Sequence, residues 1–179
     1  MTGWEQRLLA VFDDLEQQAE GLALAERDAR VADLVRAGYG ELELHARLHG
    51  AVGADVDLSL GRAGQVRGTV VRVGADWLLL DDGSHEWLVR SAALQEVRGL
   101  PDRALDEAAR AVTARLGLGS VLRSLAADAA PVLLHRTGGD VVRARLRRVG
   151  ADFVEIEPDE HPEAVAVVPW HAVAALRRG

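Results

Sequence analysis

Cysteine is absent from this chain of 179 residues. Its absence excludes a disulfide scaffold, a zinc site built on thiolates and a catalytic thiol. Lysine and asparagine are also missing, so all 21 basic residues are arginine. We interpret this bias as the codon usage of a GC-rich genome rather than as selection for a function.

Long apolar runs are missing too. No stretch approaches the roughly 20 apolar residues of a membrane-spanning helix. The first residues are charged and amphipathic, unlike a secretory signal. The sequence therefore predicts a soluble, cytoplasmic protein with no membrane partner. Hydrophobic residues make up 49% of the chain, which is enough for a folded core.

Charge is distributed unevenly along the chain. The net charge of −7 argues against a protein whose main role is to coat nucleic acid. Residues 1–50 contain 5 arginines and 10 acidic residues, whereas residues 101–150 contain 9 arginines and 5 acidic residues. Positive charge is therefore concentrated in the second half.

An internal duplication is visible in the sequence. "RVGADW" at 72–77 returns as "RVGADF" at 148–153, an offset of 76 (148 − 72 = 76). The same offset aligns 56–80 with 132–156 without a gap. After a longer second turn the offset becomes 79 (167 − 88 = 79). The chain therefore contains two copies of one unit, called here the first and the second repeat.

Each repeat has the pattern of a β-rich unit. A short helix is expected at 44–52 and at 120–129. Two strands then flank a Gly-Ala-Asp turn, where glycine and aspartate favour a tight hairpin. A tight turn and a closing strand follow. Pro101 and Gly117 favour the start and the stop of a helical linker between the repeats.

This order of elements resembles the Sm-like fold, a small barrel of the SH3 type. Gly64-Gln65-Val66-Arg67-Gly68 resembles the first motif of that superfamily, and Leu88-Val89-Arg90 with Leu94 and Val97 resembles the second. The opening residues also resemble a group of uncharacterised actinobacterial proteins, a likeness that implies no activity.

The resemblance implies an α+β protein: an N-terminal helical segment followed by two duplicated Sm-like five-stranded small β-barrels joined by a helix. The expected domains are a helical segment at 1–42, the first barrel at 43–100, the linker at 101–117 and the second barrel at 118–179.

The two hairpins are expected to differ in their outer faces. Pairing about the turns places Val71 opposite Leu79 and Thr69 opposite Asp81 in the first repeat. In the second repeat it places Arg147 opposite Glu155 and Arg145 opposite Glu157. The apolar face of the first hairpin is expected to be covered by the N-terminal helices, by the other barrel or by a second subunit.

A near-heptad apolar stripe in the first residues also needs a partner. We therefore predict a homo-oligomer. The predicted interface residues are Trp4, Leu8, Val11, Leu15, Val71, Trp77 and Leu79.

Three arginines are candidates for nucleic-acid binding. Arg143 and Arg148 lie in the basic cluster and lack obvious acidic partners. Arg90 occupies the place where the Sm-like resemblance implies a base-holding cation. The asparagine that accompanies it in Sm-like RNA binders is absent here, and with it the amide that would read a base edge.

Other candidate sites are less complete. His45 and His49 have the spacing of a metal-binding pair but no third ligand. Residues 111–125 have the helix–turn–helix look of a DNA-binding pair, with Arg123 as the one cation of the second helix. The acidic pairs Asp81-Asp82 and Asp159-Glu160 lie in turns predicted to be exposed. No catalytic residue, metal or cofactor is predicted.

The sequence therefore favours a non-enzymatic scaffold or protein-interaction module that self-associates. The alternative is an RNA-binding or regulatory protein that uses the arginine-rich second repeat. A DNA-binding regulator ranks third and an enzyme fourth, because no residue pattern indicates catalysis.

Overall fold

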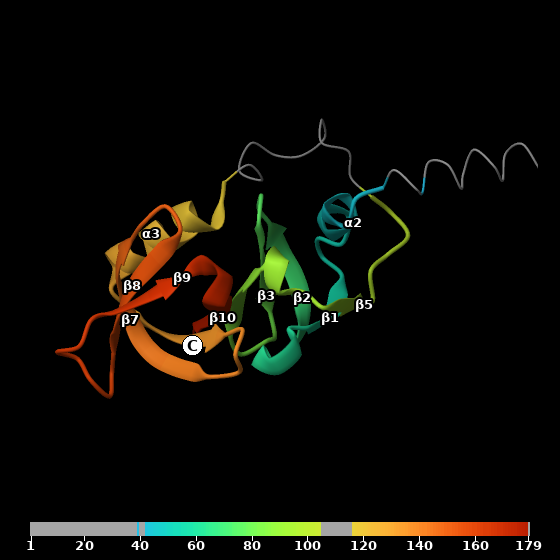
Figure 1. Cartoon of the computed structure of the whole chain (residues 1–179). Coiled ribbons are helices and arrows are strands. Elements are labelled where there is room, and N and C mark those ends of the chain that lie inside the picture. The colour runs from blue at the N-terminus through green and yellow to red at the C-terminus, as the bar shows by residue number, and fades with distance from the viewer. Residues whose placement is uncertain (1–38, 40–41, 105–115, 179) are drawn as a thin grey trace, which may run out of the picture. The chain divides into compact units, whose positions relative to one another are not determined.

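The computed structural model describes residues 39, 42–104 and 116–178 (Figure 1). The chain divides into two compact units, Met1–Leu42 and Glu43–Gly179, and the second contains all the elements discussed below. The predicted N-terminal helical segment lies outside the described residues, with the stripe of Trp4, Leu8, Val11 and Leu15.

The second unit repeats one order of elements. In the first repeat these are α2 (Leu44–Gly50), β1 (Asp55–Ser59), η1 (Gly61–Ala63), β2 (Gln65–Val73), β3 (Trp77–Asp81), β4 (Glu86–Arg90), η2 (Ser91–Ala93) and β5 (Glu96–Arg98). In the second they are α3 (Leu118–Asp128), β6 (Pro131–Arg136), β7 (Val141–Val149), β8 (Phe153–Pro158), β9 (Ala166–Pro169), η5 (Trp170–Ala172) and β10 (Val173–Arg178).

The Gly-Ala-Asp segments form the two hairpin turns that the sequence predicts. The Gly74 amide donates to the Trp77 carbonyl at 2.8 Å, and the Gly150 amide donates to the Phe153 carbonyl at 2.9 Å. In both turns the aromatic ring lies against the glycine, so closely that a Cβ atom there would collide with the ring. The predicted helices, hairpins and closing strands of both repeats are confirmed.

The arrangement of these strands is not the predicted one. All ten form one open antiparallel sheet in the order β5-β1-β2-β3-β4-β10-β6-β7-β8-β9. The expectation of two five-stranded Sm-like barrels joined by a helix is therefore wrong. A closed barrel pairs its end strands, whereas β4 of the first repeat pairs here with β10 of the second.

This pairing of β4 with β10, called here the junction, explains the open sheet. Its register runs from Ala175 opposite Val89 to Arg178 opposite Glu86. The junction supplies backbone partners to two strands that would otherwise be sheet edges, where unpaired amides and carbonyls are exposed. The sheet consequently continues from one repeat into the other.

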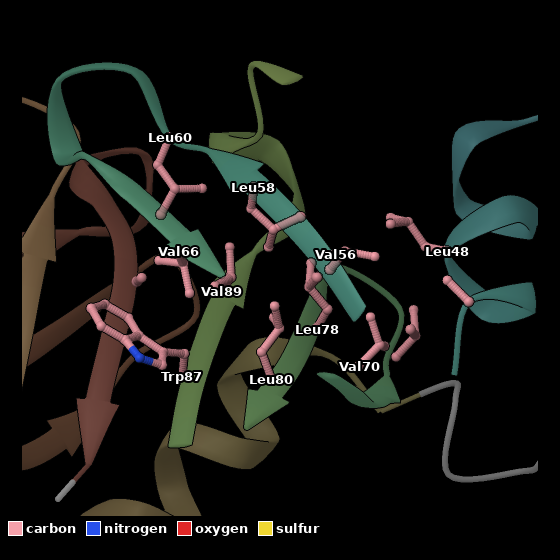
Figure 2. Close-up of a cluster of buried hydrophobic side chains, with 13 residues drawn as sticks. Leu48, Val56, Leu58, Leu60, Val66, Val70, Leu78, Leu80, Trp87 and Val89 are labelled. Atoms are coloured by element: carbon pink, nitrogen blue, oxygen red, sulfur yellow. The ribbon is translucent and has the colours of Figure 1, made fainter. Parts of the chain in front are cut away.

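Two hydrophobic clusters lie on opposite sides of the strands near the junction. Along β4, Trp87 and Val89 belong to the cluster of the first repeat and Leu88 to that of the second. Because side chains alternate between the faces of a strand, β4 is buried on both faces. Figure 2 shows Trp87 and Val89 pointing into the first cluster with Leu78 and Leu80 of β3.

A bulge in each hairpin changes the predicted register by one residue. Thr69 lies opposite Asp81 and Arg145 opposite Glu157, as expected. The register then shifts at Val71, so that Arg72 faces Leu79. The equivalent shift at Arg147 places Arg148 opposite Glu155. The predicted pairings of Val71 with Leu79 and of Arg147 with Glu155 are wrong, because a bulge sets two residues against one.

The linker predicted at 101–117 falls mostly on residues 105–115, which lie outside the described residues. The described residues at its two ends are not helical. Gly117, the predicted stop, is instead the N-cap residue directly before α3.

Candidate functional site

The arginines of the second hairpin are held in ion pairs. Their nitrogen–oxygen distances are 3.1 Å for Arg143–Asp159, 3.5 Å for Arg145–Asp159, 3.0 Å for Arg147–Glu157 and 2.8 Å for Arg148–Glu155. Arg143 and Arg148, for which no partner was evident in the sequence, therefore both have one. The hairpin bulge brings Glu155 opposite Arg148, and the turn after β8 brings Asp159 to Arg143.

Arg90 lies apart from these two arginines. It is half-buried at the end of β4, and its Nε atom has no hydrogen-bond partner among the described residues. Strands β10 and β6 lie between β4 and β7. Neighbouring strands are about 4.8 Å apart, so roughly 14 Å separates β4 from β7. Arg90 is therefore three strands along the sheet from Arg143 and Arg148, which both lie on β7.

Trp77 and Leu79 lie on the face of β3 that is turned toward the second cluster. Trp77 is 4% exposed, and its Nε1–H donates to the Leu116 carbonyl at 2.8 Å. Leu79 packs against the same cluster. The sequence allows three covers for this face: the N-terminal helices, the other repeat or a second subunit. At both Trp77 and Leu79 the structure shows the other repeat as the cover. Val71, at the bulge, stays 47% exposed.

The first hairpin also caps α3. The Leu118 amide donates to Asp76 Oδ1 at 2.6 Å, and Gly117, the residue before the helix, has no side chain to do so. A carboxylate at this place satisfies a free helix amide and lies at the positive end of the helix dipole. This contact between repeats was not foreseen from the sequence, because Asp76 was interpreted there as a turn residue.

One face of the junction carries a cluster of polar and aromatic side chains. The rings of Trp87 and His135 have their centroids 4.9 Å apart, and the Arg177 guanidinium lies 5.5 Å from the Trp87 ring centroid. Burial lowers the pKa of His135, and the charge of Arg177 lowers it further. Both effects favour the neutral form of the His135 ring next to the arginine.

Asp82 accepts several hydrogen bonds in the turn between β3 and β4. Trp87 Nε1–H donates to its Oδ2 atom at 2.8 Å, and the amides of Ser84 and His85 donate to its Oδ1 atom at 2.9 and 2.8 Å. The hydrogen bond from Trp87, followed by the one from Ser84, lowers the pKa of Asp82 to about 2. These bonds give Asp82 a role in shaping the turn.

The opposite face of the junction holds an apolar cavity of about 320 Å³, called here the junction cavity. Its residues are Arg72, Trp77, Leu79, Glu86, Leu88, Leu116, Ser120, Val121, Ser124, Leu125, Val132, Leu176 and Arg178. Strands of both repeats form its floor and α3 forms one wall. Its volume lies at the lower end of the range for small-molecule sites.

The register of the strands orders the floor of the junction cavity into two rows. Arg72 faces Leu79, Leu79 faces Leu88, and Leu88 faces Leu176. Beside this row Arg178 faces Glu86 across the junction. The floor is therefore apolar along its length, with a cation at its outer end and an opposed pair of charges along one side.

Two further candidate sites were the His45–His49 pair and the DNA-binding segment at 111–125. His45 Nε2 lies 2.8 Å from the Gly74 carbonyl oxygen, and the rings of His45 and His49 meet edge to face. Among the described residues no cluster of three metal-ligating side chains occurs. Of the DNA-binding segment, α3 packs Leu118 and Leu122 into the second cluster, while residues 111–115 lie outside the described part.

No family model and no curated protein matches this chain. Within the part of the chain that the structure describes, no helix has both the length and the apolar character needed to cross a membrane.

Proposed function

We propose that this protein is a non-enzymatic interaction module that self-associates through the two end strands of its sheet, β5 and β9. The observation that carries the proposal is the junction itself. Strand β4 of the first repeat is equivalent to β9 of the second, and β10 is equivalent to β5. Within the chain β4 pairs with β10. Their equivalents, β9 and β5, lie at the two ends of the sheet.

Exposure of equivalent residues supports this proposal. Leu88 on β4 is 4% exposed because β10 and α3 lie against it. Its equivalent on β9 at the offset of 79 is Val167, which is 59% exposed, and the neighbouring Val165 is 41% exposed. An exposed apolar edge strand is a template for pairing with another chain.

The junction also provides a register for the proposed contact. When its four pairs are moved by the offset of 79, Val168 lies opposite Glu96 and Val167 opposite Val97. The other two pairs become Ala166 opposite Arg98 and Val165 opposite Gly99. Pro169, which cannot donate a backbone hydrogen bond, falls just outside this set. Because β5 and β9 are different surfaces, the contact is head-to-tail and extends to a ring or a filament.

Light scattering on the full chain tests the proposal across a wide range of protein concentrations. We expect masses above that of the monomer, and Val167→Lys is expected to lower them to the monomer mass. Val141→Lys is the matched control, since Val141 is also an exposed valine but lies on the inner strand β7. A wild-type chain that stays monomeric, or a Val167→Lys variant that assembles normally, would contradict the proposal.

The alternative, RNA binding through Arg90, Arg143 and Arg148, has less support. Two of the three arginines are in ion pairs that RNA would have to replace. In-cell ultraviolet crosslinking followed by denaturing purification tests it directly. Crosslinked RNA that is lost in Arg143→Ala/Arg148→Ala would favour this alternative over the interaction module.

A further inference from the structure

The junction cavity exists because two repeats meet there. Leu79 and Leu88 come from the outer face of the first repeat, and Leu176 comes from the strand that closes the second. Helix α3 covers this face only partly, with Val121 and Leu125 along one wall and Ser120 and Ser124 beside them. The result is an open apolar recess between the sheet and α3.

The charges around the junction cavity are not equivalent. Arg178 has acidic neighbours, since it pairs with Asp128 at 3.4 Å and faces Glu86 across the junction. The side chain of Arg72 has no ion pair or hydrogen bond to any other described residue. Its equivalent in the second repeat, Arg148, is paired with Glu155, and the residue at the place of Glu155 is here Leu79. Among the described residues, the cavity therefore presents one cation, Arg72, without an anion beside it.

We propose that the junction cavity binds a small amphipathic carboxylate, such as a medium-chain fatty acid. The carboxylate lies against Arg72, in the place of the missing acidic partner, and the apolar chain follows the row from Leu79 to Leu176. A guanidinium is suited to this ligand because it pairs with a carboxylate through two parallel hydrogen bonds. Burial of the chain against leucine side chains supplies the rest of the affinity.

This ligand fits the cavity better than the other classes of occupant. A neutral apolar molecule would cover the leucines but leave Arg72 unmatched. A larger anion such as a nucleotide would place polar groups on an apolar floor, where they would find few hydrogen-bond partners. The inference is independent of the proposed self-association, since no residue of the cavity lies on β5 or β9.

Binding is tested on the full chain with sodium decanoate as the probe and decanol as its uncharged analogue. Isothermal titration calorimetry gives the affinities, and the indole N–H resonance of Trp77, a residue of the cavity, reports the place of binding. We expect decanoate to shift this resonance and to bind at least roughly tenfold more tightly than decanol, the effect of one charge-assisted contact.

Three variants separate this site from nonspecific binding. Arg72→Gln is expected to weaken decanoate roughly tenfold and to leave decanol unchanged. Arg67→Gln, which removes a cation of the same strand outside the cavity, is the matched control and is expected to bind normally. Val121→Phe fills the recess and is expected to abolish binding of both probes. Equal affinity of wild type and Arg72→Gln for decanoate, or an unmoved Trp77 resonance, would falsify the proposal.

Discussion

The hairpins β2–β3 and β7–β8 share one sequence pattern, one turn and one bulge, yet they lie in different environments. β3 is near the middle of the sheet and is buried on both faces, whereas β8 is next to the edge strand β9. Leu79 of the first hairpin packs against the cluster of the second repeat. Its equivalent Glu155 forms an ion pair with Arg148, and the Glu155 side chain is 16% exposed.

This difference shows how a duplicated unit becomes asymmetric. The first hairpin leads directly into the junction strand β4, and it has an apolar residue, Leu79, where the second hairpin has the charged Glu155. The second hairpin, which leads into the edge strand β9, has alternating polarity, which is typical of a sheet with one wet face. Equivalent positions of the two hairpins are therefore matched controls for one another.

The largest difference in unfolding free energy is expected between the variants Trp77→Ala and Phe153→Ala. Trp77 is almost completely buried and hydrogen-bonded to Leu116, so its truncation should cost about 3–5 kcal/mol of unfolding free energy. Phe153 is half-buried, and about 1–2 kcal/mol is expected there. Chemical denaturation measures both, and equal losses would show that the two hairpins are equally buried.

Replacement of the turn glycines by alanine comes next. The new Cβ atom meets the indole of Trp77 at Gly74 and the phenyl ring of Phe153 at Gly150. Because Trp77 is fixed by its surroundings, Gly74→Ala is expected to cost about 1–3 kcal/mol. The half-buried ring of Phe153 can move away, so Gly150→Ala should cost less than about 1 kcal/mol. Thermal unfolding of the two variants tests this order.

A smaller effect is expected at the aspartates of the same turns. Asp76→Ala removes the side-chain cap of α3 and should destabilise the protein by about 1 kcal/mol. Asp152, its equivalent, is exposed, and Asp152→Ala should change the stability by less than about 0.5 kcal/mol. Slower exchange of the Leu118 amide in wild type than in Asp76→Ala would support the cap, and identical exchange would count against it.

The smallest effect is expected in the pH dependence due to Asp82 of the turn after β3. Its folded pKa, about 2, is below the ordinary value, so its charged form contributes stability above the unfolded pKa. This contribution is lost as the pH falls toward 2. The stability difference between wild type and Asp82→Asn should therefore be present at neutral pH and disappear near pH 2. A difference that is unchanged over this range would mean that the carboxylate is not held by Trp87.

Much of the local structure could be predicted from the sequence alone. The repeated "RVGAD" located both hairpins, because glycine and aspartate favour the tight turn and the flanking residues alternate in polarity. The bulges at Val71 and Arg147 could not be located, since a single extra residue leaves the local pattern of a strand intact. The ion pair of Arg148 with Glu155 was missed for the same reason.

The candidate sites were harder to predict than the strands. Arg143 and Arg148 were selected because no acid lay at the expected pairing position, and the bulge and the turn after β8 supplied those acids. The junction cavity has no sequence motif, because its residues come from both repeats and converge only when β4 pairs with β10. The sequence predicts Trp77 and Leu79 as interface residues, and it does not predict that they line a cavity.

The sequence by itself determined the duplication, the elements of each repeat and the unequal polarity of the two hairpins. These depend on interactions between residues that are near in the chain, or on the choice between apolar and charged side chains. Only the tertiary structure decided whether each repeat closes into a barrel or joins the other in one open sheet. The backbone amides and carbonyls of an edge strand are the same in every sequence, so they can pair within a repeat or between repeats, and long-range packing around Leu88 and Leu176 decides between the two.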